Sequence, residues 1–310
     1  MKLGFLLGLV TLALIFSRPL QGQTEDQGKR EDQIRKLEEQ LKGLREQKKP
    51  GSSTSAPQGK SQPPSSYTSS DAPIGEFSPT KGLLSRWPGN GNCRDVVGCH
   101  PGLLENGATF QEGRFGKAFS FTGGGFVRVP SSPDLNPMNG LTVDAWVFPK
   151  VDGSFCVIAK WGDEGEWDNQ RAYSLTIGTG GTVGFAICND QRQWDAQFHH
   201  CETSPGAIKM KKWNFVAAVY DQRVGSRRIY VNGVQMANRT DPPITLTNSI
   251  ADLVIGGVLQ SPHLQRMNFI GLIEQVEIYN RSLSDLEVRA VFDETKAGAR
   301  KNIRRNSPAD

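Results

Sequence analysis

The sequence predicts an all-β protein: an antiparallel two-sheet sandwich of the jelly-roll type, preceded by a short helical segment and a disordered linker. Short runs rich in β-branched and aromatic residues alternate with turns of Gly, Asn, Asp and Pro. No helical pattern separates these runs, which favours an antiparallel sandwich. The expected strands are 118–122, 126–130, 141–149, 155–161, 172–178, 182–188, 213–221, 227–233, 251–257 and 269–279. An Asn-Gly pair at 232–233 predicts a hairpin turn, and Ser284 with Glu287 predicts a capped helix after the last strand.

The first residues predict export. One lysine precedes a mostly apolar run from Leu3 to Phe16, and small or polar residues follow. This is the build of a secretory signal peptide over 1–22, cleaved after Gly22. The alternative is an uncleaved anchor, for which the apolar run is short. The protein is therefore expected to be secreted, extracellular or at the cell surface.

A short charged helix is expected over 23–49. Ile34, Leu37, Leu41 and Leu44 recur at the spacing of a coiled-coil seam. The seam is shorter than the three or four heptads that define a coiled coil. Two interpretations therefore stay open: a stalk that forms a homo-oligomer, or a solvated and partly frayed helix.

Composition divides the rest of the chain into three parts. Residues 50–76 are rich in Pro, Ser and Gly and predict a flexible linker. The domain itself covers 77–295, and 296–310 is expected to be a basic disordered tail. The formal net charge is +4, but the signal region carries +2 and the tail +4, which leaves the rest of the chain near −2. A broadly basic surface for nucleic acid is therefore excluded, as is a polytopic membrane protein, because no second long apolar run occurs.

Export permits disulfides, and the chain has five cysteines. Cys93 and Cys99 bracket a short polar loop, and Cys188 and Cys201 bracket a polar stretch between two expected strands. We expect these two pairs to be disulfides and Cys156, within an apolar run, to be a small buried residue. The alternative for the second pair is a metal site with His199 and His200, but this spacing matches no zinc pattern.

Three stretches resemble the laminin-G-like, concanavalin A-like jelly-roll domains that are common in exported bacterial proteins. They are GKAFSFTGGGFVRVPSSPDLNPMNGLTVDAWVFP, KKWNFVAAVYDQRVGSRRIYVNG and NFIGLIEQVEIYNRSLSDLEV. The resemblance covers 80–295 and implies the jelly-roll fold. It leaves function open, because such domains serve as carbohydrate-binding modules, adhesion modules and accessory parts of enzymes.

The resemblance also implies a structural calcium ion. Asn92 and Asp95 match a Gly-Asn-x-x-Asp-x-x-Gly motif, and Glu274 precedes the last strand motif, where relatives have an Asp-Glu pair. These oxygen donors, Asn92, Asp95 and Glu274, are of the kind that calcium prefers. Two departures oppose it, since Glu274 is longer than Asp and Gln275 lacks a charge. Ordinary turn residues with no ion are the alternative.

No pattern predicts an enzyme. The Glu-x-Asp-x-x-Glu string of jelly-roll glycoside hydrolases does not occur. The acidic residues of the segment 163–168 lie in an expected loop, where crowded carboxylates are usually solvated. Neither Gly-x-Ser-x-Gly nor His-Glu-x-x-His occurs. We therefore expect a non-catalytic binding module.

The candidate ligand site consists of Trp161, Trp167 and Trp194 with Asp168. These indoles flank polar, charged loops, whereas Trp87, Trp146 and Trp213 are expected in the core. A sugar can stack its C–H face on an indole while polar groups bind its hydroxyls, so a glycan or polysaccharide is the expected ligand. Two alternatives stay open: the rings pack under their own loops, or the domain is a structural or adhesion module that binds a surface protein.

Two sequons also occur, Asn238-Arg-Thr and Asn280-Arg-Ser. They can accept an N-linked glycan only in a host that glycosylates exported chains. They carry no part of the predicted function.

Overall fold

The computed structural model describes residues 80–137, 139–162, 170–189, 200–259 and 267–297. The chain divides into two compact units, 1–70 and 71–310, and all described residues belong to the second. The expected helix at 23–49 and linker at 50–76 lie outside the described residues, and so do Trp167, Asp168 and Trp194. No helix in the described ranges is long and apolar enough to cross a bilayer.

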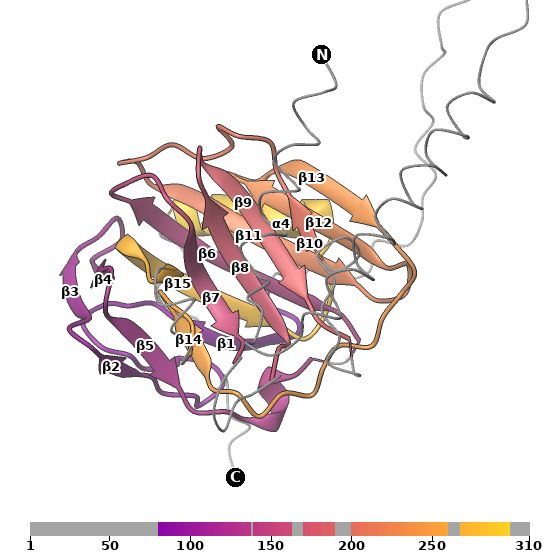
Figure 1. Cartoon of the computed structure of the whole chain (residues 1–310), viewed down its shortest axis with the longest axis horizontal. Helices are drawn as coiled ribbons and strands as arrows, with labels where there is room; N and C mark the ends of the chain where they lie inside the picture. The colour runs from indigo at the N-terminus through magenta and orange to yellow at the C-terminus, as the bar shows by residue number, and fades with distance from the viewer. Residues whose placement is uncertain (1–79, 138, 163–169, 190–199, 260–266, 298–310) are drawn as a thin grey trace, which may run out of the picture. The chain divides into compact units, whose positions relative to one another are not determined.

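Two antiparallel sheets form the domain (Figure 1). The eight-stranded sheet runs β13 (Val234–Thr240), β12 (Ser226–Val231), β11 (Asn214–Asp221), β6 (Leu141–Pro149), β15 (Ile270–Tyr279), β4 (Lys117–Thr122) and β3 (Thr109–Glu112), and β1 (Leu83–Trp87) also pairs with β15. The seven-stranded sheet runs β10 (His200–Glu202), β9 (Thr182–Ile187), β8 (Tyr173–Gly178), β7 (Phe155–Lys160), β14 (Leu253–Ile255), β5 (Phe126–Val129) and β2 (Leu103–Glu105). The predicted two-sheet sandwich is confirmed.

Alternation along the strands builds the core between the sheets. In β6, Leu141, Val143 and Val147 point into this core, while Trp146 belongs to a separate cluster on the opposite face. Strands β8 and β9 alternate in the same way, so that every second residue of each strand lies in the core. Fully burying one such aliphatic side chain contributes about 1.5–3 kcal/mol.

The helix α4 (Asp285–Lys296) covers part of the outer face of the eight-stranded sheet (Figure 1). Its first turn has the predicted capping box: Ser284 Oγ accepts from the Glu287 amide at 3.3 Å, and the Ser284 amide donates to Glu287 at 2.8 Å. Phe292 stacks against Trp146, with 5.7 Å between ring centroids. The predicted helix is therefore confirmed, and its apolar face is buried on the sheet.

Two local backbone features set side-chain directions. Asn232 and Gly233 both have positive φ values, +52° and +78°, which confirms the predicted hairpin turn between β12 and β13. A bulge in β15 places Gln275 at φ +53° and shifts the register between Glu274 and Glu277. Because of the extra residue, Glu274 and Glu277 both lie on the face of β15 that points away from the main core.

Candidate functional site

Trp161 follows β7 and lies in a small apolar cluster on the outward face of the seven-stranded sheet. Its side chain is only 8 % exposed and packs with Cys156, Ala186 and Val258. The guanidinium carbon of Arg171 lies 5.9 Å from the centre of the ring. For Trp161 the structure therefore favours packing, because little of the indole is open to a sugar. Trp167, Asp168 and Trp194 lie outside the described residues.

The segments that carry Trp167 and Trp194 begin at the same end of three neighbouring strands of the seven-stranded sheet, β7, β8 and β9. Tyr173 is opposite Lys160 on one side and Ile187 on the other. Gly162 and Gln170 exchange two backbone hydrogen bonds of 3.3 and 3.0 Å. Two sequence-predicted site segments, 163–169 and 190–199, therefore start from neighbouring strand ends, although they are well separated in the sequence.

The other expected tryptophans are not surface residues. Trp87 is fully buried, and Trp146 is 2 % exposed. Trp146 donates from Nε1 to Thr295 Oγ1 at 3.0 Å. Trp213 is half-buried against Phe148, with 5.6 Å between ring centroids. None of these three rings offers a fully open stacking face.

Asp95 organises the loop that the sequence assigned to calcium. Its Oδ1 accepts from the backbone amides of Arg86, Val97 and Gly98 at 2.9–3.0 Å. Its Oδ2 accepts from the His100 amide at 3.1 Å. The carboxylate is thus surrounded by amide donors, which stabilise its charge without a metal ion.

The other two expected calcium ligands also bind backbone amides. Asn92 Oδ1 accepts from the Arg94 amide at 3.0 Å. Glu274 is fully buried, and its two oxygens accept from the amides of Arg114 and Phe115 at 3.1 and 3.4 Å. A Cβ at Gly113 would lie 2.6 Å from Glu274 Oε2, so this turn needs glycine. Glu274 therefore fixes the turn at 113–115, whereas the hydrogen bonds of Asp95 and Asn92 go to other backbone amides.

Arg86 is a buried cation that links the Asp95 loop to β15, the two regions that the resemblance places around calcium. Arg86 is 2 % exposed; its Nη2 donates to Gln275 Oε1 at 2.6 Å, and its Nε lies 3.2 Å from Glu277 Oε1. Within the described ranges, no group of three or more His, Cys, Asp or Glu residues could hold a metal ion. The calcium ion that the resemblance implies stays a prediction, and Asp95, Asn92 and Glu274 already accept backbone hydrogen bonds.

The expected disulfide pairs differ from the structure, in which no disulfide joins two of the five cysteines. Cys201 is opposite Phe185 in the β9–β10 register, three residues from Cys188 along β9. The two sulfurs are thus not brought together, and the predicted Cys188–Cys201 disulfide is not formed. The predicted Cys93–Cys99 disulfide is also not formed, and hydrogen bonds to Asp95 hold that loop instead. Cys156 is buried as expected, and burial raises its pKa to about 12.

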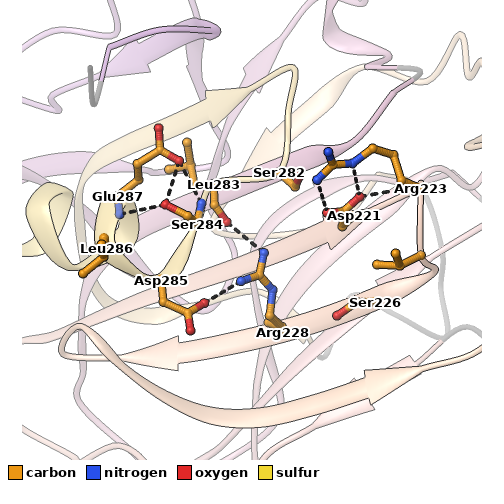
Figure 2. A pocket seen from close by; sticks show the side chains of 11 residues that line it. Asp221, Arg223, Ser226, Arg228, Ser282, Leu283, Ser284, Asp285, Leu286 and Glu287 are labelled. Carbon is orange, nitrogen blue, oxygen red and sulfur yellow. Dashed lines mark hydrogen bonds and ion pairs between the residues drawn. The ribbon is translucent and has the colours of Figure 1, made fainter. Parts of the chain in front are cut away.

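A pocket that the sequence did not indicate lies beside the first turn of α4. Its volume is about 690 Å³, and it is lined by the ends of β11 and β12 and by residues 282–287. Figure 2 shows its charges in pairs: Arg223 with Asp221 at 2.8 Å, and Arg228 with Asp285 at 2.5 Å. No aromatic residue lines it. It offers hydrogen bonds but no stacking surface, and the capping box in its wall predicted a helix start and not a pocket.

Two packed antiparallel sheets with one covering helix define the class of jelly-roll domains built like lectins. The family model described as the concanavalin A-like lectin/glucanases superfamily, Laminin_G_3, matches residues 121–289. The chain belongs to this family, as the resemblance implied.

Among curated proteins, human usherin is 27 % identical over 194 residues, which is 62 % of this chain and 3 % of usherin. Among solved structures, the binding domain of Paraclostridial Mosquitocidal Protein 1 has a TM-score of 0.53 at 14 % identity, covering 70 % of this chain and 53 % of that one. The receptor binding domain of botulinum neurotoxin D has a TM-score of 0.51 at 14 % identity, covering 70 % and 54 %. The chain thus spans a small part of usherin and about half of each toxin domain, and the structural matches show the fold alone.

Proposed function

We propose that the protein is a secreted, non-catalytic module that binds a glycan or polysaccharide. Membership of a lectin-like family supports this class of ligand. The observation that carries the proposal is the meeting, at Tyr173, of the strand ends that flank the two tryptophan-bearing segments. Stacking on Trp167 and Trp194, with Asp168 binding hydroxyls, is the proposed contact.

The ionisation of the carboxylates in the pocket beside α4 supports a non-catalytic role. The hydrogen bond from Arg223 holds the pKa of Asp221 below its ordinary value. Glu287 is partly desolvated, but hydrogen bonds from Arg281 and Ser284 outweigh this and lower its pKa. Both side chains are therefore ionised at neutral pH, and neither is suited to donate a proton to a leaving group.

One experiment distinguishes glycan binding from the second candidate function, binding of a surface protein. Affinity gel electrophoresis of the full chain through a panel of soluble polysaccharides should show retardation by at least one of them. Trp167→Ala and Trp194→Ala should each reduce the retardation several-fold, since an aromatic contact contributes about 1 kcal/mol beyond its buried area.

Trp213→Ala is the matched control, because this half-buried ring lies on the other sheet. It should leave the retardation unchanged. Equal loss in all three variants, or no retardation by any polysaccharide, would count against glycan binding at these strand ends and favour a protein partner.

A further inference from the structure

The strand β13 forms an open edge of the eight-stranded sheet. It pairs with β12 on one side, and the described residues supply no strand on its other side. Val234 and Met236 are 54 % and 47 % exposed on this strand. An open edge with exposed apolar side chains can pair with another chain unless something covers it. Figure 1 shows β13 at the margin of the sandwich.

A sequon lies within this edge strand. Asn238 and Thr240 are exposed, whereas Arg239 between them is less exposed, and its guanidinium binds Asp241. Asn238 Oδ1 accepts from Ser226 Oγ at 3.2 Å, which holds the amide plane at the surface. No described residue binds Asn238 Nδ2. The atom that would carry a glycan is therefore accessible, and the hydroxyl of the sequon is on the same exposed side.

We propose that Asn238 carries an N-linked glycan when the chain passes through a eukaryotic secretory pathway, and that this glycan covers the β13 edge. The donor is an oligosaccharide linked to a polyprenyl pyrophosphate. A bond forms between Asn238 Nδ2 and the anomeric carbon of the first sugar, and the bond from that carbon to the pyrophosphate oxygen breaks. The lipid pyrophosphate leaves, and Nδ2 gives up one proton.

The position of Asn238 explains why a glycan there would affect association. The register of β13 shifts at Met236, which has no directly opposite residue on β12, and Asn238 lies two residues further along the strand. A glycan at Asn238 would therefore start close to Met236. A bulky, hydrated chain at Asn238 would cover Met236 and obstruct approach to the side of the strand that does not pair with β12. Glycosylation would thus keep the sandwich monomeric at this edge without any change in the fold.

The second sequon provides an internal comparison. Asn280 follows β15, its amide donates to Gly82 O, and its Oδ1 lies 2.7 Å from where a Cβ of Gly82 would be. This side chain lies against the β1 turn and not along an open edge. A glycan at Asn280 would therefore leave β13 uncovered.

Site-resolved mass spectrometry of the full chain secreted from cultured animal cells tests the proposal. Peptide-N-glycosidase F in heavy-oxygen water should convert Asn238 to labelled Asp in most molecules. Thr240→Ser keeps the sequon and should keep the modification, whereas Thr240→Ala should abolish it while Asn238 remains. Unmodified Asn238 in the secreted wild-type chain would overturn the proposal, whether or not Asn280 is modified.

The covering role has its own readout. Sedimentation velocity should show more self-association for Asn238→Gln than for the wild type, and no such change for Asn280→Gln. Removal of the glycan from the folded wild-type protein should reproduce the effect, which separates it from misfolding of the variant. Equal sedimentation of the glycosylated and deglycosylated protein would overturn the covering role.

Discussion

Arg86 lies on β1, and its guanidinium reaches two residues of β15, Gln275 and Glu277. Glu277 is directly opposite Asp144 of β6, and both carboxylates are buried. Two such charges are costly to bury together unless a cation or hydrogen-bond donors balance them. Arg86 supplies a permanent positive charge at this point, and its amide also holds Asp95. A protein cation thus joins the two regions that the family motif places around calcium.

Removal of this cation should destabilise the domain. Arg86→Met should lower the free energy of unfolding by about 3–5 kcal/mol, because Glu277 stays buried without its charge partner. Glu277→Gln added to Arg86→Met should recover part of the loss. Arg94→Met, at an exposed neighbouring position, is the control and should change little. Urea denaturation measures these differences.

The same arrangement predicts that calcium is not needed for stability. A chelator should leave the Tm of the wild-type protein unchanged, since Asp95 and Glu274 already bind backbone amides. A rise of Tm on addition of calcium would show that these loops rearrange around an ion, contrary to the structure.

Lys160 should give the stability a pH dependence. Its ammonium is buried between Ser131 Oγ and Ala251 O, and burial lowers its pKa from 10.5 to about 8. The unfolded chain therefore binds the proton more tightly, so stability should rise between pH 8 and 10.5 as the folded protein releases it. Lys160→Met should remove this rise, which amounts to about 3 kcal/mol. Denaturation at several pH values tests it, and parallel curves for the two proteins would contradict it.

At the scale of elements, α4 depends on its cap as well as on its packing. Ser284→Ala removes the hydroxyl that accepts from the Glu287 amide. It should lower the free energy of unfolding by about 1 kcal/mol. Leu286→Ala, in the same turn with its side chain 76 % exposed, should have a smaller effect. If both variants lost equal stability in urea, the cap would not explain the start of the helix.

Strands with a buried face were predictable from the sequence, but edge strands were not. Each of β6, β11 and β15 has buried apolar residues at regular intervals, and the expected ranges contain them. The edge strand β13 reads VQMANRT, and its side chains are mostly exposed, so no apolar alternation marks it. For the same reason β3 was missed. Helix α4 was predictable because its capping box is a local signal.

The candidate site was less predictable than the fold, because it depends on register. The sequence placed Cys188 near Cys201, but the β9–β10 register sets Cys201 opposite Phe185. The resemblance implied that Asp95 and Glu274 share one ion; this stays a prediction, while the structure shows that each carboxylate accepts backbone hydrogen bonds from its own loop. The sequence identified Trp161 as a surface ring because a polar loop follows it, but the ring itself is covered. Sequence distance does not report which strand ends meet in three dimensions.

At the scale of the whole molecule, one core cluster joins the two sheets of the sandwich. The neighbouring ends of β7, β8 and β9 bring together segments that are distant in the sequence. The expected homo-oligomer through 23–49 stays a prediction; if formed, it would multiply weak sites on one polymer. Binding in this account needs the folded domain and the tryptophan segments but no metal ion.

The decisive measurement is a glycan array probed with the full chain in a buffer with chelator. We expect saturable binding to a defined set of glycans, unchanged when calcium replaces the chelator. If the protein binds no glycan on the array while its circular dichroism shows a folded β-domain, glycan binding is contradicted.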